Sequence, residues 1–336
     1  MLKILVVAPA WIGDTILAQP LLSRLQEQHS HLAIDVLAGA WTAPLLKRMP
    51  EVRHVIDSPF RHGEFNLAAR WKLGRHLAKE GYDEAVVLPN SWKSALVPFF
   101  AGIPKRTGYT GEARYGLINN RHTLDKVALP RLADRYTRLA EGRRSAHAHS
   151  VRRPHLKTSL AQQQAVHHAL GLPGGVTPII FCPGAEYGPA KRWPARHFAT
   201  LASVLHTPEH PVWLLGSPKD AEVGEEIARL SCGAATNLCG RTSLDQAIDL
   251  LATAKLVVCN DSGLMHVAAA LERPLVALFG SSSHNYTPPM SPRAKILSLD
   301  LDCSPCFKRT CPLGHANCLN ELTPELVLAS LRTDAG

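Results

Sequence analysis

The stretch NDSGLMHVAAAL, residues 260–271, places an acid, a hydroxyl and a glycine just before a histidine and a run of small apolar residues. A strand-like run, KLVV, precedes it, and the apolar residues that follow suit a helix. Amides at a helix start attract anions, and glycine permits close approach. Asp261, Ser262, Gly263 and His266 are therefore candidate ligands of a diphosphate. The alternative is an ordinary helix cap beside a half-buried histidine.

Two further loops also follow strand-like runs. CPGAEYGPAKRWP, residues 182–194, offers Lys191 as a point charge for phosphate, or else is an exposed loop anchored by its tryptophan. In LLGSPKDAEVGEEI, Asp220 begins a helix, where it either caps that helix or binds a ribose. We expect Lys191 and the helix start near Ser262 to lie at strand ends of one domain, where a diphosphate would bind.

Near the start of the chain, Gly13 and Asp14 lie where a strand turns into a helix. Asp14 is a candidate functional carboxylate, and a simple helix cap is the alternative. The turn lacks the G-x-G-x-x-G spacing with which dinucleotide-binding folds admit a pyrophosphate. A dehydrogenase is therefore disfavoured.

The segment CSPCFKRTCPLGHANC, residues 303–318, contains four cysteines and a histidine. Its spacing, C-x2-C-x4-C-x6-C, resembles metal-ligand usage but lacks the long central spacer of a zinc ribbon. Two alternatives stay open, a zinc or iron–sulfur site and reduced thiols that pack a loop. The candidate metal ligands are Cys303, Cys306, Cys311 and Cys318, with His315 nearby.

Short apolar runs alternate with helix-like segments in both halves of the chain, which predicts parallel sheets covered on both faces. Between the halves, roughly over residues 145–177, this pattern stops, and we place a domain junction there. In parallel sheets of this kind ligands bind beyond the carboxyl ends of the strands. The expected strands are 3–9, 33–39, 84–90, 178–184, 211–217, 255–261 and 274–280; the expected helices are 15–28, 43–49, 94–102, 161–170, 195–206, 221–231, 243–254 and 262–272.

Composition limits the class of protein. The 336 residues carry a net charge of +9, with Lys and Arg dispersed along the chain, so anionic partners are expected. The first residues lack a cleavage site of the signal-peptide kind, and no run is long and apolar enough to span a membrane. We expect a cytosolic protein with reduced thiols, attached at most to a membrane surface. A basic nucleic-acid-binding protein with a metal site at the cysteines is an alternative, although no reading motif supports it.

Four motifs, GDTILAQP, LPNSWKSALVPFFAGIPKRTGY, CPGAEYGPAKRWP and NDSGLMHVAAALERPLVALFGSSS, occur in this order and together resemble the bacterial lipopolysaccharide heptosyltransferases over nearly the whole chain. The resemblance implies the α/β GT-B architecture, two facing Rossmann-like doubly wound domains with a central cleft. Residues 1–160 would bind the acceptor, and residues 175–336, including the Cys-rich tail, the nucleotide sugar.

The resemblance also implies inverting transfer of L-glycero-D-manno-heptose from ADP-heptose to the first heptose of the inner core, on heptosyl-Kdo-lipid A. A paralogue that adds the first or the third heptose is the alternative. No cofactor or metal besides the donor substrate would be required, and no nucleic acid would be bound. The enzyme would work in the cytoplasm, peripherally at the inner face of the inner membrane.

The resemblance assigns roles to individual residues. Asp14 matches the family's general base, and the loops described above match its donor site. Lys93 is the firmest match to the family's basic groups, which would contact Kdo carboxylates and core phosphates. For the weaker matches Arg61, Arg114 and Arg135, solvated surface charge is the alternative. The implied donor residues are Lys191, Asp220, Asp261, Ser262, Gly263 and His266; the implied acceptor residues are Lys93, Arg61, Arg114 and Arg135.

Overall fold

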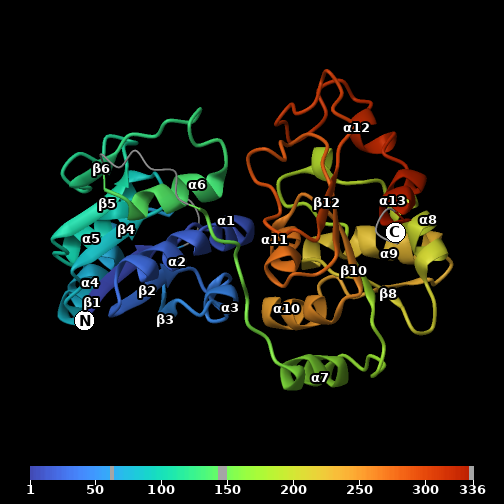
Figure 1. Ribbon diagram of the computed structural model, residues 1–336, viewed down its shortest axis with the longest axis horizontal. Coiled ribbons are helices and arrows are strands. Elements are labelled where there is room, and N and C mark those ends of the chain that lie inside the picture. The colour runs from blue at the N-terminus through green and yellow to red at the C-terminus, as the bar shows by residue number, and fades with distance from the viewer. Residues whose placement is uncertain (61–63, 143–149, 333–336) are drawn as a thin grey trace. The chain divides into compact units, whose positions relative to one another are not determined.

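The computed structural model describes residues 1–60, 64–142 and 150–332 and divides the chain into two compact units, Met1–Leu156 and Lys157–Gly336 (Figure 1). The division falls within the stretch 145–177, where the alternating pattern stops. Each unit is an α/β domain built around its own sheet.

The first unit contains a six-stranded sheet of order β3-β2-β1-β4-β5-β6, in which every neighbouring pair is parallel. The central strands are the apolar runs predicted from sequence, whereas β3, β5 and β6 carry charged or polar side chains and were not predicted. The strands are β1 (Leu2–Val7), β2 (Leu32–Ala38), β3 (Val52–Asp57), β4 (Glu84–Val87), β5 (Lys105–Tyr109) and β6 (Asn120–His122).

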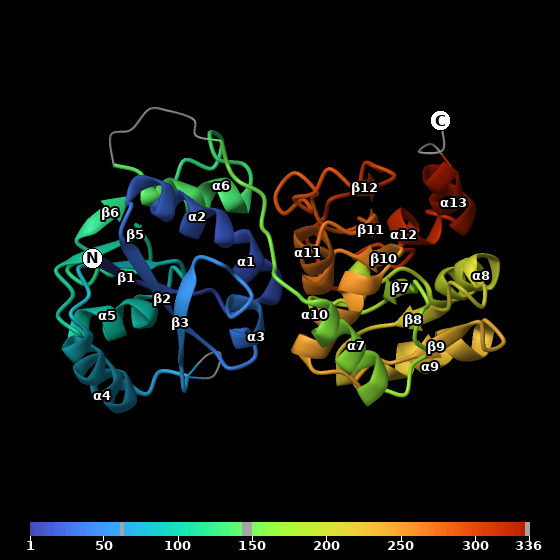
Figure 2. The same ribbon diagram turned by 60° about the horizontal axis from the view of Figure 1, so that its bottom comes forward.

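Helices cover both faces of this sheet. Helices α1, α2 and α6 pack together on one face, and α4 packs on α5 on the other (Figures 1 and 2). The single helix predicted for 15–28 is two helices, because Pro20 lies in the first turn of α2, where its missing N–H is tolerated. The helices are α1 (Ile12–Leu17), α2 (Gln19–Gln28), α3 (Ala43–Leu46), α4 (Leu67–Leu77), α5 (Leu96–Phe100) and α6 (Leu132–Thr137), with 3-10 turns η1 (Ala78–Glu80), η2 (Trp92–Ala95) and η3 (Arg138–Ala140).

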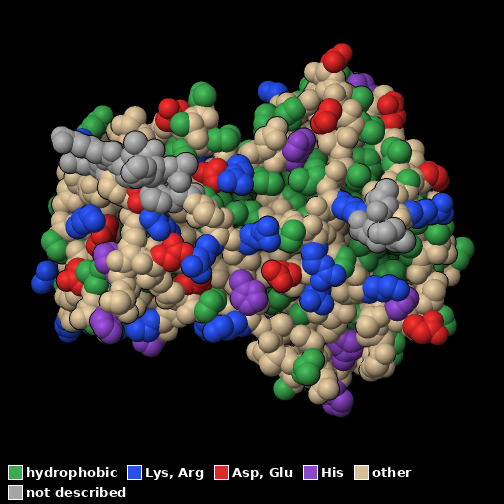
Figure 3. Space-filling model, in the orientation of Figure 1, with side chains coloured by type: hydrophobic (Ala, Val, Ile, Leu, Met, Phe, Trp, Pro, Cys, Tyr) green, Lys and Arg blue, Asp and Glu red, His purple; other side chains and the backbone are tan. Residues whose placement is uncertain are grey.

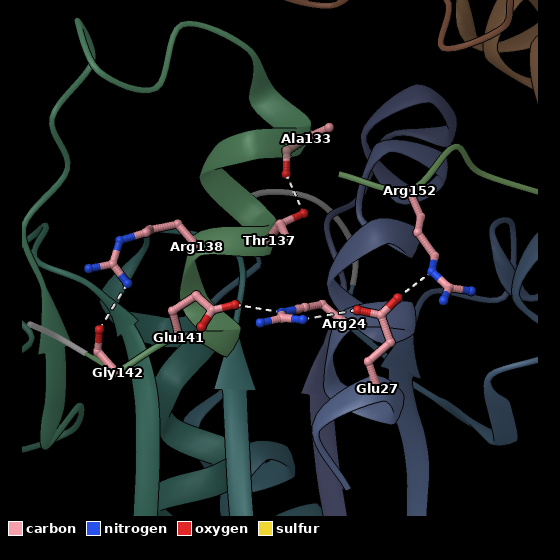
Figure 4. A network of polar contacts seen from close by, with 8 residues as sticks. All are labelled: Arg24, Glu27, Ala133, Thr137, Arg138, Glu141, Gly142 and Arg152. Atoms are coloured by element: carbon pink, nitrogen blue, oxygen red, sulfur yellow. Dashed lines mark hydrogen bonds and ion pairs between the residues drawn. The ribbon is translucent and has the colours of Figure 1, made fainter. Parts of the chain in front are cut away.

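A chain of ion pairs fastens the end of the first unit to α2 (Figure 4). Arg24 Nε lies 2.6 Å from Glu141 Oε1, just after η3, and Arg24 Nη1 lies 3.1 Å from Glu27 Oε2. Glu27 also pairs with Arg152, on the segment that leaves the unit. Two segments distant in sequence, at Glu141 and at Arg152, are thereby held to α2.

The second unit repeats the same topology. Its six parallel strands have the order β12-β11-β10-β7-β8-β9. When this order is read from the β9 edge and the strands are renumbered from β7, it is identical to that of the first unit. The strands are β7 (Ile179–Cys182), β8 (Val212–Leu214), β9 (Ala235–Asn237), β10 (Leu256–Asn260), β11 (Leu275–Leu278) and β12 (Ala294–Leu297).

In the second unit, alternate apolar residues of β7 and of β10 belong to one hydrophobic core. Phe181 of β7 and Val258 of β10 pack with Phe198 of α8 and Ile227 of α9, while α10 packs on α7 and α11. Every residue of β7 and β10 is buried, which explains their unbroken apolar sequences. The helices are α7 (Leu160–Ala169), α8 (Ala195–Leu205), α9 (Ala221–Leu230), α10 (Leu244–Thr253), α11 (Gly263–Ala270), α12 (Asn317–Asn320) and α13 (Pro324–Arg332), with turns η4 (Pro189–Lys191) and η5 (Pro218–Asp220).

The surface agrees with the dispersed charge of the sequence. On the face in Figure 3, Lys and Arg side chains lie scattered among acidic ones on both units. No helix of the described residues is long and apolar enough to cross a membrane.

Candidate functional site

The strand orders locate the ligand-binding edge of each unit. The direction of winding reverses between β1 and β4 in the first sheet and between β7 and β10 in the second. Ligands of such sheets bind beyond the carboxyl ends of the two strands at this reversal. The loops after β1 and β4 lead to Asp14 and Lys93, and those after β7 and β10 lead to Lys191 and Asp261.

In the second unit, the predicted loops meet around one carboxylate. Lys191 Nζ lies 2.5 Å from Asp261 Oδ2, and Ser282 Oγ donates to the same oxygen at 2.5 Å. Asp261 is buried, and the side chain of Lys191 is 18% exposed. The structure therefore brings Lys191 and Asp261 together and adds Ser282, from the GSSS loop after β11, which was not among the predicted site residues.

Asn260 fixes the spacing of these loops. Its Oδ1 accepts from Trp193 N at 3.0 Å, and its Nδ2 donates to Pro183 O at 2.7 Å. The fully buried Trp193 ring donates through Nε1 to Leu322 O at 2.6 Å. Asn260 was not among the predicted site residues, although its position beside Asp261 at the end of a buried strand could have indicated it.

Helix α11 begins beside this cluster, two residues after Asp261. Ser262 is its N-cap residue, but its side chain makes no capping hydrogen bond, and Gly263 is the first helical residue. His266 is buried in the second turn, its Nδ1 has no hydrogen-bond partner among the described residues, and burial lowers its pKa to about 4. A neutral histidine thus lies beneath a helix start whose positive end is open to an anion.

Asp220 acts as a helix cap in this structure. Its Oδ2 accepts from Ser217 N at 2.9 Å, as part of a capping box in which the Ser217 side chain accepts from the Asp220 backbone, and it also accepts from Ser217 Oγ at 2.7 Å. Oδ1 lies 3.7 Å from Arg192 Nη2. Gly184, after β7, leaves room for this carboxylate, because a Cβ there would lie 2.4 Å from Oδ2. Because Ser217 occupies Oδ2, Oδ1 is the oxygen of Asp220 that a ribose hydroxyl would contact.

Asp14 lies in the first turn of α1 and is half-buried. Trp11, which is exposed, is the N-cap of that helix, so Asp14 does not occupy the cap position itself. A carboxylate here benefits from the positive end of the helix dipole. The loop that carries it follows β1, at the winding reversal of the first sheet.

Lys93 lies in η2, on the loop after β4, and its side chain is half-buried. Its carbonyl accepts from Arg70 Nη1 at 3.1 Å. Arg70 is buried, also donates to Glu64 O and Phe65 O, and packs its guanidinium on the Phe60 ring. The backbone of Lys93 is thereby fixed, while its ammonium group takes no part in that fixation.

The other acceptor candidates differ in exposure. Arg114 is 3% exposed, and its guanidinium donates to Tyr109 O, Pro89 O and Asn90 Oδ1 at 2.6–3.1 Å. This geometry favours a role in holding the β4 loop over direct contact with a ligand. Arg135 is half-buried in α6 and donates to Leu129 O and Pro130 O. Arg61 lies outside the described residues.

The Cys-rich segment surrounds a small cavity of the second unit. Cys303, Cys306, Cys311 and Cys318 line it together with His315, and all four thiols are free. Backbone amides, foremost that of Ala316, lower the pKa of Cys311. Among the described residues, however, no group of three or more His, Cys, Asp or Glu side chains is arranged to hold a metal ion.

Two Rossmann-like domains with this strand order have the architecture of GT-B glycosyltransferases, and the open helix start beside Lys191 suits a nucleotide-diphosphate donor. Residues 70–317 match the family model of glycosyltransferase family 9 (heptosyltransferase). The chain belongs to this family.

Several relatives match over nearly their full length. The lipopolysaccharide heptosyltransferase 2 of Escherichia coli (strain K12) is 47% identical over 339 residues, which cover 98% of this chain and 97% of the relative. The lipooligosaccharide heptosyltransferase 2 of Haemophilus influenzae (strain ATCC 51907 / DSM 11121 / KW20 / Rd) is 44% identical over 345 residues, 98% of each chain. A solved structure of E. coli ADP-heptose LPS heptosyltransferase II superimposes with a TM-score of 0.87 at 44% identity, covering 99% of this chain and 98% of that one. The predicted GT-B fold and glycosyltransferase class are confirmed; the facing arrangement and central cleft stay predictions.

Proposed function

We propose that this protein transfers heptose from ADP-heptose to the first heptose of the lipopolysaccharide inner core. The observation that carries the donor assignment is the cluster of Lys191, Asp261 and Ser282 beside the open start of α11. The relatives at 44–47% identity are named for the second heptose, which favours that acceptor over those of first- and third-heptose paralogues.

The donor diphosphate binds at the start of α11 in this proposal. The amides near Ser262 and Gly263 and the ammonium group of Lys191 stabilise the charge that the departing ADP gains. Asp261 and Ser282 orient Lys191, His266 supports the helix start as a neutral side chain, and Asp220 offers Oδ1 to the ribose. In this proposal these groups take the place of a metal ion, and no cofactor besides the donor substrate is required.

Asp14 is the general base. Inversion requires one group that removes the proton of the acceptor hydroxyl while its oxygen attacks the anomeric carbon opposite the leaving ADP. Its half-buried position in the first turn of α1, at the ligand-binding edge of the first sheet, supports this role. No covalent intermediate is formed.

The first unit binds the acceptor through basic groups. Lys93 meets anionic groups of the core directly, since its backbone is fixed and its ammonium group is not used for that purpose. Arg114 positions the same loop from beneath. Arg135 and Arg61 are further candidates for contact with Kdo carboxylates or phosphates.

We place this reaction in the cytoplasm, with the enzyme peripherally attached at the inner face of the inner membrane, where a lipid-anchored acceptor would be met. The net charge of +9 suits an anionic surface. Nucleic-acid binding is the rival use of that charge, and retention of RNA or DNA on a filter at physiological salt would support the rival instead.

The decisive experiment measures ADP release from ADP-heptose with acceptors that carry no heptose, one heptose or two. Release with the one-heptose acceptor alone is the expected result. Release with a different acceptor would move the specificity to a paralogous reaction, and no release from folded protein with any of them would overturn the donor assignment.

A further inference from the structure

The Cys-rich segment touches both loops that support Asp261. Phe307 N donates to Ser281 O at 2.7 Å, and Ala190 N donates to Arg309 O at 3.1 Å. Ser281 precedes Ser282, and Ala190 precedes Lys191. We call residues 307–309 the strap, because it joins the neighbours of the two side chains that bind Asp261.

Tyr187 adds two more hydrogen bonds to this junction. Its Oη donates to Phe307 O at 2.8 Å, and its carbonyl accepts from Arg309 Nε at 2.8 Å. The approach is close, because a Cβ on Gly188 would lie 2.5 Å from Arg309 O. The strap is therefore a fixed part of the loop that carries Lys191.

The Tyr187 ring brings two cations together. Lys191 Nζ lies 5.1 Å and Arg309 Cζ 5.7 Å from its centroid. Lys191 forms an ion pair with Asp261. Arg309 is exposed, and no acidic side chain of the described residues pairs with it, so it is the cation with net charge to offer.

We propose that Arg309 binds the diphosphate of the donor as a second cation beside Lys191, and that the Cys-rich segment is the part of the fold that mounts it there. The inference rests on the proposed function, because it takes the donor to be a nucleotide-diphosphate sugar. A guanidinium offers paired N–H donors that match phosphate oxygens. Nε holds the side chain through Tyr187 O, which leaves Nη1 and Nη2 for the ligand.

The test is calorimetric titration of the full chain with ADP and, separately, with adenosine. Arg309→Ala should weaken ADP binding about tenfold, as expected for one lost charge-assisted contact, and leave adenosine binding unchanged. Arg309→Lys, which keeps the charge but not the fork, should fall between wild type and Arg309→Ala. The matched control is Lys308→Ala, which removes an exposed charge one residue away and should bind ADP as wild type does.

Three results would overturn the inference while the proposed function survives. These are wild-type ADP affinity in Arg309→Ala, an equal loss of adenosine affinity in that variant, or the same ADP loss in Lys308→Ala. If the wild-type protein binds neither ADP nor adenosine, the proposed function itself fails, and the inference with it.

Discussion

Lys191 Nζ and Asp261 Oδ2 lie 2.5 Å apart, although 70 residues separate them along the chain. The pair joins the loop after β7 to the end of β10, and Ser282 Oγ shares the same carboxylate oxygen. Both side chains are largely withdrawn from water, at 18% and 6% exposure. A pair in this position costs desolvation when it forms, so the loss of one partner is felt strongly.

The pair should therefore be sensitive to removal of its cation. Lys191→Met leaves the Asp261 carboxylate without its cation and should lower the free energy of unfolding by about 2 kcal/mol while weakening ADP binding. Lys219→Met breaks an exposed pair with Glu186 and should cost nothing measurable. Urea unfolding of both variants checks this; equal losses in the two would mean that the Lys191 pair is energetically a surface pair.

Replacement of Asp14 should separate binding from turnover. Asp14→Asn keeps the size of the side chain and removes its basicity, so turnover should fall about 100-fold or more while ADP-heptose binding stays near wild type. Asp57→Asn is a suitable control, because Asp57 is an exposed carboxylate at the end of β3 in the same sheet. Near wild-type turnover in Asp14→Asn would remove the assignment of Asp14 as base.

His266 should make the fold sensitive to acid. Burial lowers its pKa to about 4, with Asp261 opposing and Lys191 reinforcing this shift. Between about pH 6.5 and pH 4 the unfolded chain binds a proton that the folded chain does not, so stability falls as the pH drops, by up to about 3 kcal/mol.

Unfolding measured across this pH range tests the contribution of His266. His266→Gln should flatten the dependence, whereas His54→Gln, on an exposed position of β3, should leave it as in wild type. An unchanged slope in His266→Gln would show that other groups cause the acid sensitivity. The predicted direction follows from a lowered histidine pKa, which favours the neutral ring in the folded state.

Sequence patterns predicted the buried strands well, because β1, β4, β7 and β10 are continuous apolar runs. They did not predict β3, β5, β6, β9 and β12, since short outer strands with polar or charged side chains do not form such a run. The sequence also led us to expect Lys191 and the helix start near Ser262 at strand ends of one domain, but it did not predict the ion pair between Lys191 and Asp261.

The partners of that pair were harder to predict. Ser282 belongs to a loop with turn-like composition, and its role depends on the sheet order, which places β11 beside β10. Arg114 has the residue type of a ligand-binding group, but only the packing around it reveals that backbone carbonyls occupy its guanidinium. Residue type alone cannot separate a buried arginine from an exposed one.

Arg114 and Lys93 should consequently respond differently to substitution. Arg114→Ala leaves buried carbonyl oxygens without their donor and should lower the free energy of unfolding by about 2–4 kcal/mol. Lys93→Ala should leave stability unchanged and raise KM for the acceptor, because only its backbone is used by Arg70. Lys126→Ala, an exposed control on the loop after β6, should change neither quantity. A stable Arg114→Ala variant with a raised acceptor KM would make Arg114 a direct ligand instead.

The cysteines should differ in reactivity according to their surroundings. Backbone amides of Ala316, Leu313, Gly314 and His315 lower the pKa of the Cys311 thiol. In contrast, burial raises the pKa values of the thiols of Cys182, Cys239 and Cys259. The pKa of Cys239 is raised to about 12.

Because the thiolate is the reactive form, iodoacetamide should label Cys311 in the folded protein well before those three. Its labelling rate should reach half its maximum at a lower pH than that of an unperturbed cysteine, since the amides stabilise the charged form. Mass spectrometry of digests taken over time at several pH values measures both effects, and urea-unfolded protein, in which all sites are exposed, is the control. If Cys311 instead labels as slowly as Cys182 when folded, the thiolate is protected; restoration of labelling by a chelator would then identify a bound metal as the cause.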